Sequence, residues 1–162
     1  MLWGDVLVDG HNHIWRYRGF CDALSRAGVA HPAEEVRFGR DTIEAGRSEA
    51  HSLLAAVPDL TALFVSNDLP AIGALQAAAD LGLAVPGELS VCGITDIQLA
   101  REVRPALTTV AVPTAEAAQL AVDSLMNLIN EDPRGGDAGS RIATISAPRL
   151  IVRASTGRAA KR

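Results

Sequence analysis

The sequence predicts an α/β protein in which a parallel sheet carries helices on both faces. Short apolar runs rich in β-forming residues alternate with longer segments whose apolar residues recur at the spacing of one helix face. The loops between these segments are only a few residues long, which favours parallel strands joined by right-handed helical crossovers. We therefore expect an open sheet that is covered by helices.

The N-terminal half contains two predicted strand–helix pairs. Gly28 is a C-terminal stop signal for the first helix. Asp41 and Glu44 have the spacing of a capping box, which predicts the start of the second helix. The predicted strands cover residues 5–8 and 35–38, and the predicted helices cover residues 14–27 and 41–56.

A strand–helix–strand unit occupies residues 63–96 and is the most informative part of the chain. A strand over residues 63–65 is followed by a helix that stops at Gly82. After a Pro-Gly turn, residues 89–94 form the second strand. In open parallel sheets, ligands bind beyond the carboxyl ends of the strands. The polar residues at these two ends are Ser66, Asn67, Asp68, Thr95 and Asp96.

The C-terminal part is predicted to contain one more strand–helix pair and a returning strand. Residues 107–112 form the strand, and Thr114 can cap a helix over residues 114–130 that has an apolar stripe. Residues 134–140 have too little apolar character to pack, so a mobile loop is expected there. Residues 142–152 supply the last strand or strands.

The composition predicts a globular chain without a membrane segment. With 48% hydrophobic but only 4% aromatic residues, the core must be built from small aliphatic side chains. The formal net charge of -4 gives no surface that attracts nucleic-acid phosphates in bulk. No apolar run reaches the roughly 20 residues that span a bilayer, and the N-terminus lacks a signal-peptide pattern. Cys21 and Cys92 are expected to be free thiols in a cytoplasmic protein.

Several motifs occur in a fixed order along the chain. They are Ser-Asn-Asp-x-x-Ala-x-Gly-Ala-Leu from Ser66, Leu-Gly-Leu-x-Val-Pro from Leu81, Leu-Ser-Val-x-Gly-Ile-x-Asp from Leu89, and Pro-x-Leu-Thr-Thr-Val from Pro105. The pattern extends to Arg-x-x-Gly-Phe at Arg16 and to Leu-Ile-Val-Arg-Ala-Ser-Thr-Gly at Leu150. Over roughly residues 14–157 the chain resembles the effector-binding domain of LacI/GalR-type bacterial transcription repressors.

The resemblance implies an incomplete lobe of the type I periplasmic-binding-protein-like fold, in which three segments join two lobes after a helix-turn-helix domain. We expect residues 1–157 to be the effector-binding domain, mostly its C-terminal lobe, and residues 158–162 to be a disordered tail. The DNA-binding domain is expected to be absent. In such proteins the segment resembling residues 114–130 crosses to the first lobe, so its stripe should be exposed, docked differently or self-associated.

The resemblance also implies ligand contacts. Arg16 matches an arginine that faces the cleft between the lobes, where its fixed donors hold ligand oxygens. Asn67 matches an asparagine whose amide donates and accepts at once, whereas Asp68 is expected to be structural and to accept amide hydrogens at the helix start. Thr95 replaces an acid of the family pattern and cannot supply a charge-assisted bond. The predicted ligand-binding residues are Arg16, Asn67, Thr95 and Asp96, with Asp96 as a candidate for the role of the missing acid.

These features predict the effector-sensing part of a LacI-family transcription regulator, expected to be a repressor, that binds a small sugar-like or nucleoside-like ligand in a cleft. An aromatic residue that stacks on the effector in relatives is missing near Asp41. DNA would be bound only through the missing N-terminal domain, and no cofactor, metal or membrane partner is expected. A homodimer is expected through residues 69–80. The alternative is a free sugar-binding module of the periplasmic type.

A His-x-His pair offers a rival interpretation. His11 and His13 resemble the first metal ligands of metal-dependent amidohydrolases. Such enzymes need further ligands spread over a barrel of typically ~250 residues, and only His31 and His51 remain. No nucleophile elbow or phosphate-binding loop is present. The chain is therefore predicted not to be an enzyme, and His11 and His13 are expected to be loop residues near the cleft rim.

Overall fold

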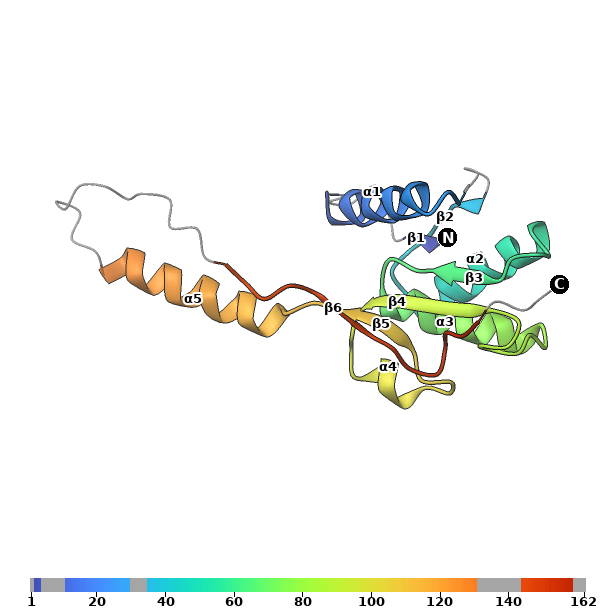
Figure 1. The fold of residues 1–162 in the computed structure, drawn as a ribbon. Coiled ribbons are helices and arrows are strands. Elements are labelled where there is room, and N and C mark those ends of the chain that lie inside the picture. Colours follow the sequence, from blue (N-terminus) through green and yellow to red (C-terminus); the bar gives the residue numbers. More distant parts are fainter. Residues whose placement is uncertain (1, 4–10, 30–34, 131–143, 159–162) are drawn as a thin grey trace.

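The computed structural model describes residues 2–3, 11–29, 35–130 and 144–158 (Figure 1). Four predicted features lie outside the described residues. They are the strand at residues 5–8, the loop at residues 134–140, His31, and residues 159–162 of the tail.

Four strands form the main sheet, in the order β3-β4-β5-β6 (Figure 1). The first three run parallel, and β6 pairs antiparallel with β5. A separate parallel pair joins β1 to β2. The mostly parallel sheet confirms the predicted fold class, with an antiparallel strand at one edge. The strands are β1 Leu2–Trp3, β2 Arg37–Phe38, β3 Ala62–Phe64, β4 Ser90–Thr95, β5 Thr108–Ala111 and β6 Arg149–Ile151.

The helices follow the predicted pattern with two differences. The first helix begins at His11, so the expectation that His11 and His13 lie in a loop is wrong for their backbone. The short α4 has no counterpart among the predictions, because a single turn shows no helical periodicity. Gly28 and Gly82 adopt φ values of 68° and 70° after α1 and α3, as expected for glycine stop signals. The helices are α1 His11–Arg26, α2 Ile43–Ala56, α3 Asp68–Asp80, α4 Leu99–Glu102 and α5 Thr114–Asn130.

The core lies where α2 and α3 pack together and against the sheet. A Cβ atom added at Gly73 would stand 2.1 Å from the Ile43 carbonyl oxygen, and one at Gly46 would stand 2.3 Å from the Pro70 carbonyl oxygen. Only glycine allows the two helix backbones to come this close. The largest fully buried apolar side chains are Leu53, Leu63, Val65, Leu89, Val91 and Leu107.

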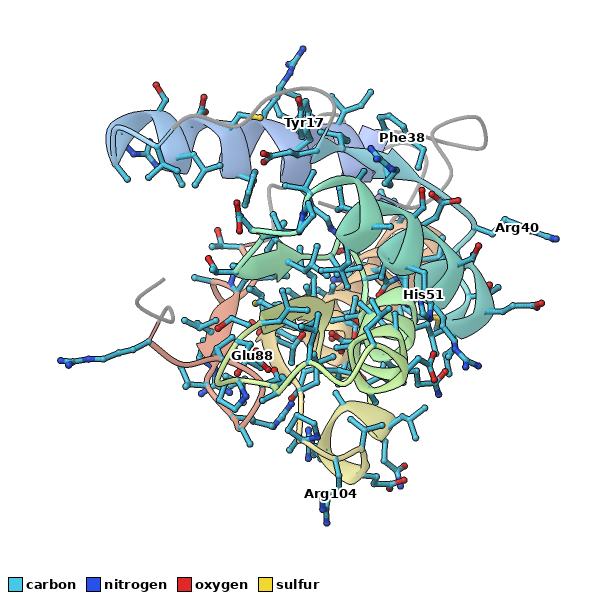
Figure 2. The ribbon with its side chains drawn as sticks, turned by 90° about the vertical axis from the view of Figure 1, so that its right-hand side faces the viewer. Tyr17, Phe38, Arg40, His51, Glu88 and Arg104 are labelled. Atoms are coloured by element: carbon cyan, nitrogen blue, oxygen red, sulfur yellow. The ribbon has the colours of Figure 1, made fainter. Side chains whose placement is uncertain are left out.

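Helix α1 lies on the opposite side of the sheet from α3 (Figure 1). Phe20 of α1 stacks on Phe64 of β3, with ring centroids 5.0 Å apart. Charged side chains such as Arg40 and Arg104 point away from the body of the molecule (Figure 2). Helices therefore cover both faces of the sheet, as the sequence predicts.

Helix α5 projects away from the rest of the chain (Figure 1), and none of its residues is buried. Of the three outcomes predicted for its apolar stripe, namely exposure, a different docking and self-association, the structure of the single chain shows exposure. The exposed fractions of its large apolar residues are 55% for Val122, 56% for Leu125, 50% for Met126, 61% for Leu128 and 64% for Ile129.

Self-association through residues 69–80 stays a prediction, and helix α3 offers few exposed residues for it. Most of this helix is buried within the chain, because it lies between α2 and the sheet. Gln76, Ala79 and Asp80 are its exposed residues. The buried residues of this segment are Pro70, Ala71, Ile72, Gly73, Ala74, Leu75, Ala77 and Ala78. Little of the helix is left for a partner.

Two further expectations concern the chain as a whole. Within the described residues, no helix is both long enough and apolar enough to cross a membrane. Cys21 and Cys92 form no disulfide in the described part of the structure, as predicted, and both are partly buried.

Candidate functional site

The polar residues after β3 and at the end of β4 meet at one edge of the sheet. The Thr95 hydroxyl donates to the Asn67 side-chain oxygen across 2.9 Å and to a carboxylate oxygen of Asp68 across 3.3 Å. This contact follows from the topology, because β3 and β4 are parallel neighbours whose carboxyl ends lie side by side. The structure therefore brings Asn67 and Thr95 together, as expected from the strand order.

Asn67 is the N-cap residue of α3 and also the centre of a small polar group. Its side-chain oxygen accepts from the Asp68 amide at 2.9 Å, and its Nδ2 donates to the Asp41 carboxylate at 2.5 Å. Asp41 therefore lies next to the site, whereas the sequence pattern predicts that it caps a helix. The N-cap of α2 is instead Thr42, whose hydroxyl accepts from the Ala45 amide at 3.2 Å. The one-residue shift frees the Asp41 carboxylate to face Asn67.

Arg16 reaches the same edge from α1. Its Nη1 donates to the Ser66 carbonyl oxygen across 2.6 Å, directly before Asn67 in the chain. Burial lowers the pKa of the Arg16 guanidinium, and the charges of Asp41 and Asp68 act in the opposite direction. A half-buried cation therefore stands beside the polar group, as the resemblance implies for this residue.

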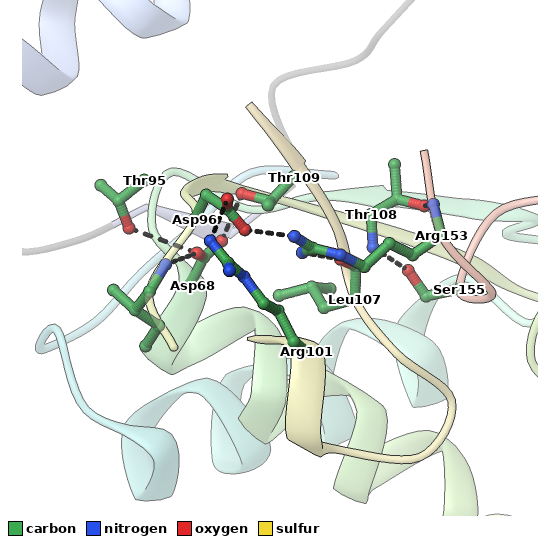
Figure 3. A network of polar contacts seen from close by, with 10 residues as sticks. Asp68, Thr95, Asp96, Arg101, Leu107, Thr108, Thr109, Arg153 and Ser155 are labelled. Atoms are coloured by element: carbon green, nitrogen blue, oxygen red, sulfur yellow. Dashed lines mark hydrogen bonds and ion pairs between the residues drawn. The ribbon is translucent and has the colours of Figure 1, made fainter. Parts of the chain in front are cut away.

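Asp68 is structural, but in a different way from the prediction. Its carboxylate is fully buried and accepts from the Thr109 hydroxyl at 2.6 Å and from the Ile97 amide at 2.9 Å (Figure 3). Its partners thus come from β5, from Thr95 at the end of β4 and from the segment that follows, rather than from the first turn of α3. A Cβ atom at Gly93 would stand 2.3 Å from Asp68 Oδ1, so glycine makes room for this buried acid.

Thr95 and Asp96 are two consecutive non-glycine residues with positive φ, 119° and 57°, at the end of β4. Such backbone conformations are uncommon for residues with a side chain and persist only where the surroundings hold them. Here the Asp96 carboxylate accepts from Arg153 at 2.5 Å and from Arg101 at 3.0 Å (Figure 3). The two neighbouring side chains therefore have different partners. Thr95 contacts Asn67 and Asp68, whereas Asp96 contacts the two arginines.

The Asp96 carboxylate does not join the group around Asn67. Its side chain is only 12% exposed, and both of its oxygens are bound by arginine. Burial raises the pKa of Asp96, but the hydrogen bonds and charges of Arg153 and Arg101 outweigh it, so the pKa lies below its ordinary value. The sequence does not predict the contact of Arg153 with Asp96, because the two residues lie 57 positions apart in the chain.

Of the histidines in the rival metal-site interpretation, only His51 has a side chain in the described part of the structure. His51 lies on α2 and pairs with Asp80 at 3.0 Å on the surface. The side chains of His11 and His13 are outside the described part of the structure. Among the described residues, no group of three or more His, Cys, Asp or Glu side chains is placed to hold a metal ion. Burial, with a further contribution from Asp68, raises the pKa of Cys92 to about 11, which leaves a protonated and poorly nucleophilic thiol.

An open, mostly parallel sheet with hydrogen-bonding side chains at its carboxyl edge is the arrangement in which α/β domains bind ligands. The model of the periplasmic binding protein-like domain matches residues 6–156. The chain therefore belongs to the periplasmic binding protein-like family, and the relatives it matches are LacI/GalR-type transcription regulators, as the sequence motifs indicate.

Three similar proteins illustrate this relationship. The chain is 34% identical over 140 residues to the HTH-type transcriptional regulator GalR of Escherichia coli K12, covering 86% of this chain and 39% of that protein. It is 38% identical over 114 residues to the ribose operon repressor of Haemophilus influenzae, covering 70% and 34%. A LacI-family sugar-binding transcriptional regulator from Escherichia coli, solved with phosphate, superimposes with a TM-score of 0.80 at 32% identity, covering 95% and 53%.

The chain spans well under half the length of the curated relatives it matches. The solved relative has a similar relation, because almost the whole of this chain covers about half of that structure. The family and the fold are thus common to these proteins.

Proposed function

We propose that this chain is the effector-sensing part of a LacI-family transcription regulator, and that the edge formed by Arg16, Asn67 and Thr95 is one wall of its ligand site. The ligand class is a small sugar-like or nucleoside-like molecule. The observation that carries the proposal is the convergence of these three residues at the carboxyl ends of adjacent parallel strands. Asp96 belongs to the proposal through its effect on Thr95, since arginines occupy its own carboxylate.

The chemistry of the wall suits a hydroxylated ligand. The Arg16 guanidinium presents several donors in a fixed plane, of which one is used by the Ser66 carbonyl. Asn67 Nδ2 carries two hydrogens, and one of them is directed to Asp41. The Thr95 hydroxyl donates toward Asn67 and Asp68, which leaves its oxygen lone pairs as acceptors. A sugar hydroxyl both donates and accepts, so it matches this mixed set.

The proposed organisation places the sensor domain at residues 1–157, with α5 as the segment that crosses toward a second lobe. DNA contact is assigned to a helix-turn-helix domain outside these residues, as the names of the HTH-type relatives suggest. Ligand binding would regulate DNA binding through different ligand affinities in two conformations. The site of action is the cytoplasm, where transcription regulators meet DNA, and no catalytic step is proposed.

Ligand titration monitored by ¹H–¹⁵N correlation spectra of the whole chain tests the proposal, because it detects weak binding to a single wall. D-ribose, D-galactose and cytidine serve as neutral probes. At least one of them is expected to shift the Asn67 side-chain amide and the amides around Thr95, and Arg16→Ala and Asn67→Ala should abolish the shifts. Arg104→Ala is the matched control, because its guanidinium bonds only backbone carbonyls at the end of α4. Binding that survives both site variants would overturn the proposal.

A further inference from the structure

Asp41 adds a carboxylate to the proposed ligand wall. It is exposed, and its Oδ2 accepts from Asn67 Nδ2 across 2.5 Å. Asn67 in turn accepts from Thr95, so Asp41, Asn67 and Thr95 form one continuous chain of hydrogen bonds. The second carboxylate oxygen of Asp41 is an acceptor at the exposed end of this chain.

The exposed negative charge of the wall belongs to Asp41. Arg16 reaches this edge through the Ser66 carbonyl, and next to Thr95 the Asp96 carboxylate binds Arg101 and Arg153. Two carboxylates, Asp41 and Asp68, act on Arg16 electrostatically. Asp68 is fully buried and occupied by Thr109, Ile97 and Thr95, whereas Asp41 is exposed to an incoming ligand. A ligand would therefore meet the negative charge of Asp41, whereas the guanidiniums of Arg16, Arg101 and Arg153 already face carboxylates.

We propose that Asp41 determines specificity, so that the site selects neutral polyhydroxylated ligands and rejects ligands that carry a carboxylate or a phosphate. The inference rests on the proposed function and deepens it. A carboxylate accepts short, charge-assisted bonds from vicinal hydroxyl groups, so it strengthens the binding of a sugar. A site for an anion needs donors alone. The negatively charged Asp41 carboxylate would repel an anionic ligand by Coulomb's law. Its oxygen lone pairs would also receive no hydrogen bond from that ligand.

The conservative variant Asp41→Asn separates charge from hydrogen bonding. The side-chain oxygen of the new amide can still accept from Asn67 Nδ2, so the chain of hydrogen bonds and the fold are retained. Asp123→Asn is the matched control, because it removes one negative charge from the exposed surface of α5, far from the wall (Figure 1). Any effect of net charge alone would be the same in both variants.

The experiment measures binding of matched neutral and anionic probes to the whole 162-residue chain by the same spectral titration. D-galactose is paired with D-galacturonate, and D-ribose with D-ribose 5-phosphate. The wild type and Asp123→Asn are expected to bind the neutral member more tightly in each pair. In Asp41→Asn the affinity for the anionic member relative to the neutral one should rise about tenfold, as expected for removal of one nearby charge.

The outcomes separate the inference from the function on which it rests. An unchanged affinity ratio in Asp41→Asn would overturn the role of Asp41, and so would a wild type that prefers the anionic member. In either case, ligand binding that depends on Arg16 would still support the proposed wall. If none of the neutral probes binds to the wild type, the proposed function fails and the inference fails with it. A tenfold change that also occurs in Asp123→Asn would show a general effect of net charge and would overturn the inference.

Discussion

Arg153 binds Asp96 across 2.5 Å and so ties the segment that follows β6 to the end of β4. The same guanidinium donates to the Leu107 carbonyl oxygen at 2.8 Å, next to β5. Three neighbouring parts of the sheet are therefore joined at one point (Figure 3). The ion pair also anchors Asp96 directly beside Thr95, where both residues have positive φ and the Thr95 hydroxyl donates to Asn67.

Removal of the Arg153 guanidinium should lower the stability of the fold. The Arg153 side chain is 15% exposed and that of Asp96 is 12% exposed, so Arg153→Ala leaves a largely buried carboxylate without its main partner. We expect the free energy of unfolding in urea to fall by about 3 kcal/mol. Arg101→Ala is the control, because Arg101 binds the same carboxylate but is 63% exposed, and its loss should cost less than about 1 kcal/mol. Equal losses in the two variants would contradict this role of Arg153.

The lowered pKa of Asp96 predicts how stability depends on pH. A carboxylate whose pKa is lower in the folded state stabilises the fold above its unfolded pKa of about 3.9, and that contribution is lost as pH falls through the folded value. The wild type should therefore be more stable than Asp96→Asn at pH 7, and the difference should shrink between about pH 5 and pH 2. Urea unfolding of both proteins across this range measures it. A difference that is constant with pH would show that Asp96 does not titrate in this way.

The close contact between the backbones of α2 and α3 leads to a prediction about packing. In Gly73→Ala the new methyl group would meet backbone atoms at 2.1 Å and 2.5 Å, which cannot give way as a flexible side chain can. We expect a loss of about 3 kcal/mol or more in unfolding free energy. Gly19→Ala is the control, because its Cβ would meet no heavy atom within 4 Å and the residue lies in helix α1. That variant should gain up to about 1 kcal/mol from helix propensity.

The fold was largely predictable because its determinants are local. Apolar periodicity and the glycine stop signals at Gly28 and Gly82 locate the main helices to within a few residues. The order of parallel strands then places Asn67 beside Thr95, although they are separated by 28 positions. Both inferences need only the sequence pattern and the general behaviour of α/β sheets.

The contacts that distinguish this site depend on three-dimensional packing. The shift of the helix cap from Asp41 to Thr42 is one residue in sequence, but it turns a capping acid into a neighbour of Asn67. The burial of Asp68 depends on Thr109, 41 positions away. Local patterns carry no information about either contact, because several rotamers and strand registers are compatible with the same residues.

The apolar stripe of α5 predicts self-association of the chain. Leu125 and Ile129 lie one helical turn apart with exposed fractions of 56% and 64%, and burying such side chains against a second copy is favourable. Sedimentation velocity at increasing concentration should show a growing fraction of dimers or larger species. The double variant Leu125→Gln, Ile129→Gln should remain monomeric, with an unchanged urea midpoint, because neither side chain is buried in the monomer. Gln119→Ala and Asp123→Ala alter polar positions of the same helix and should leave association intact. A wild type that is a compact monomer at all concentrations would show that the stripe does not drive association.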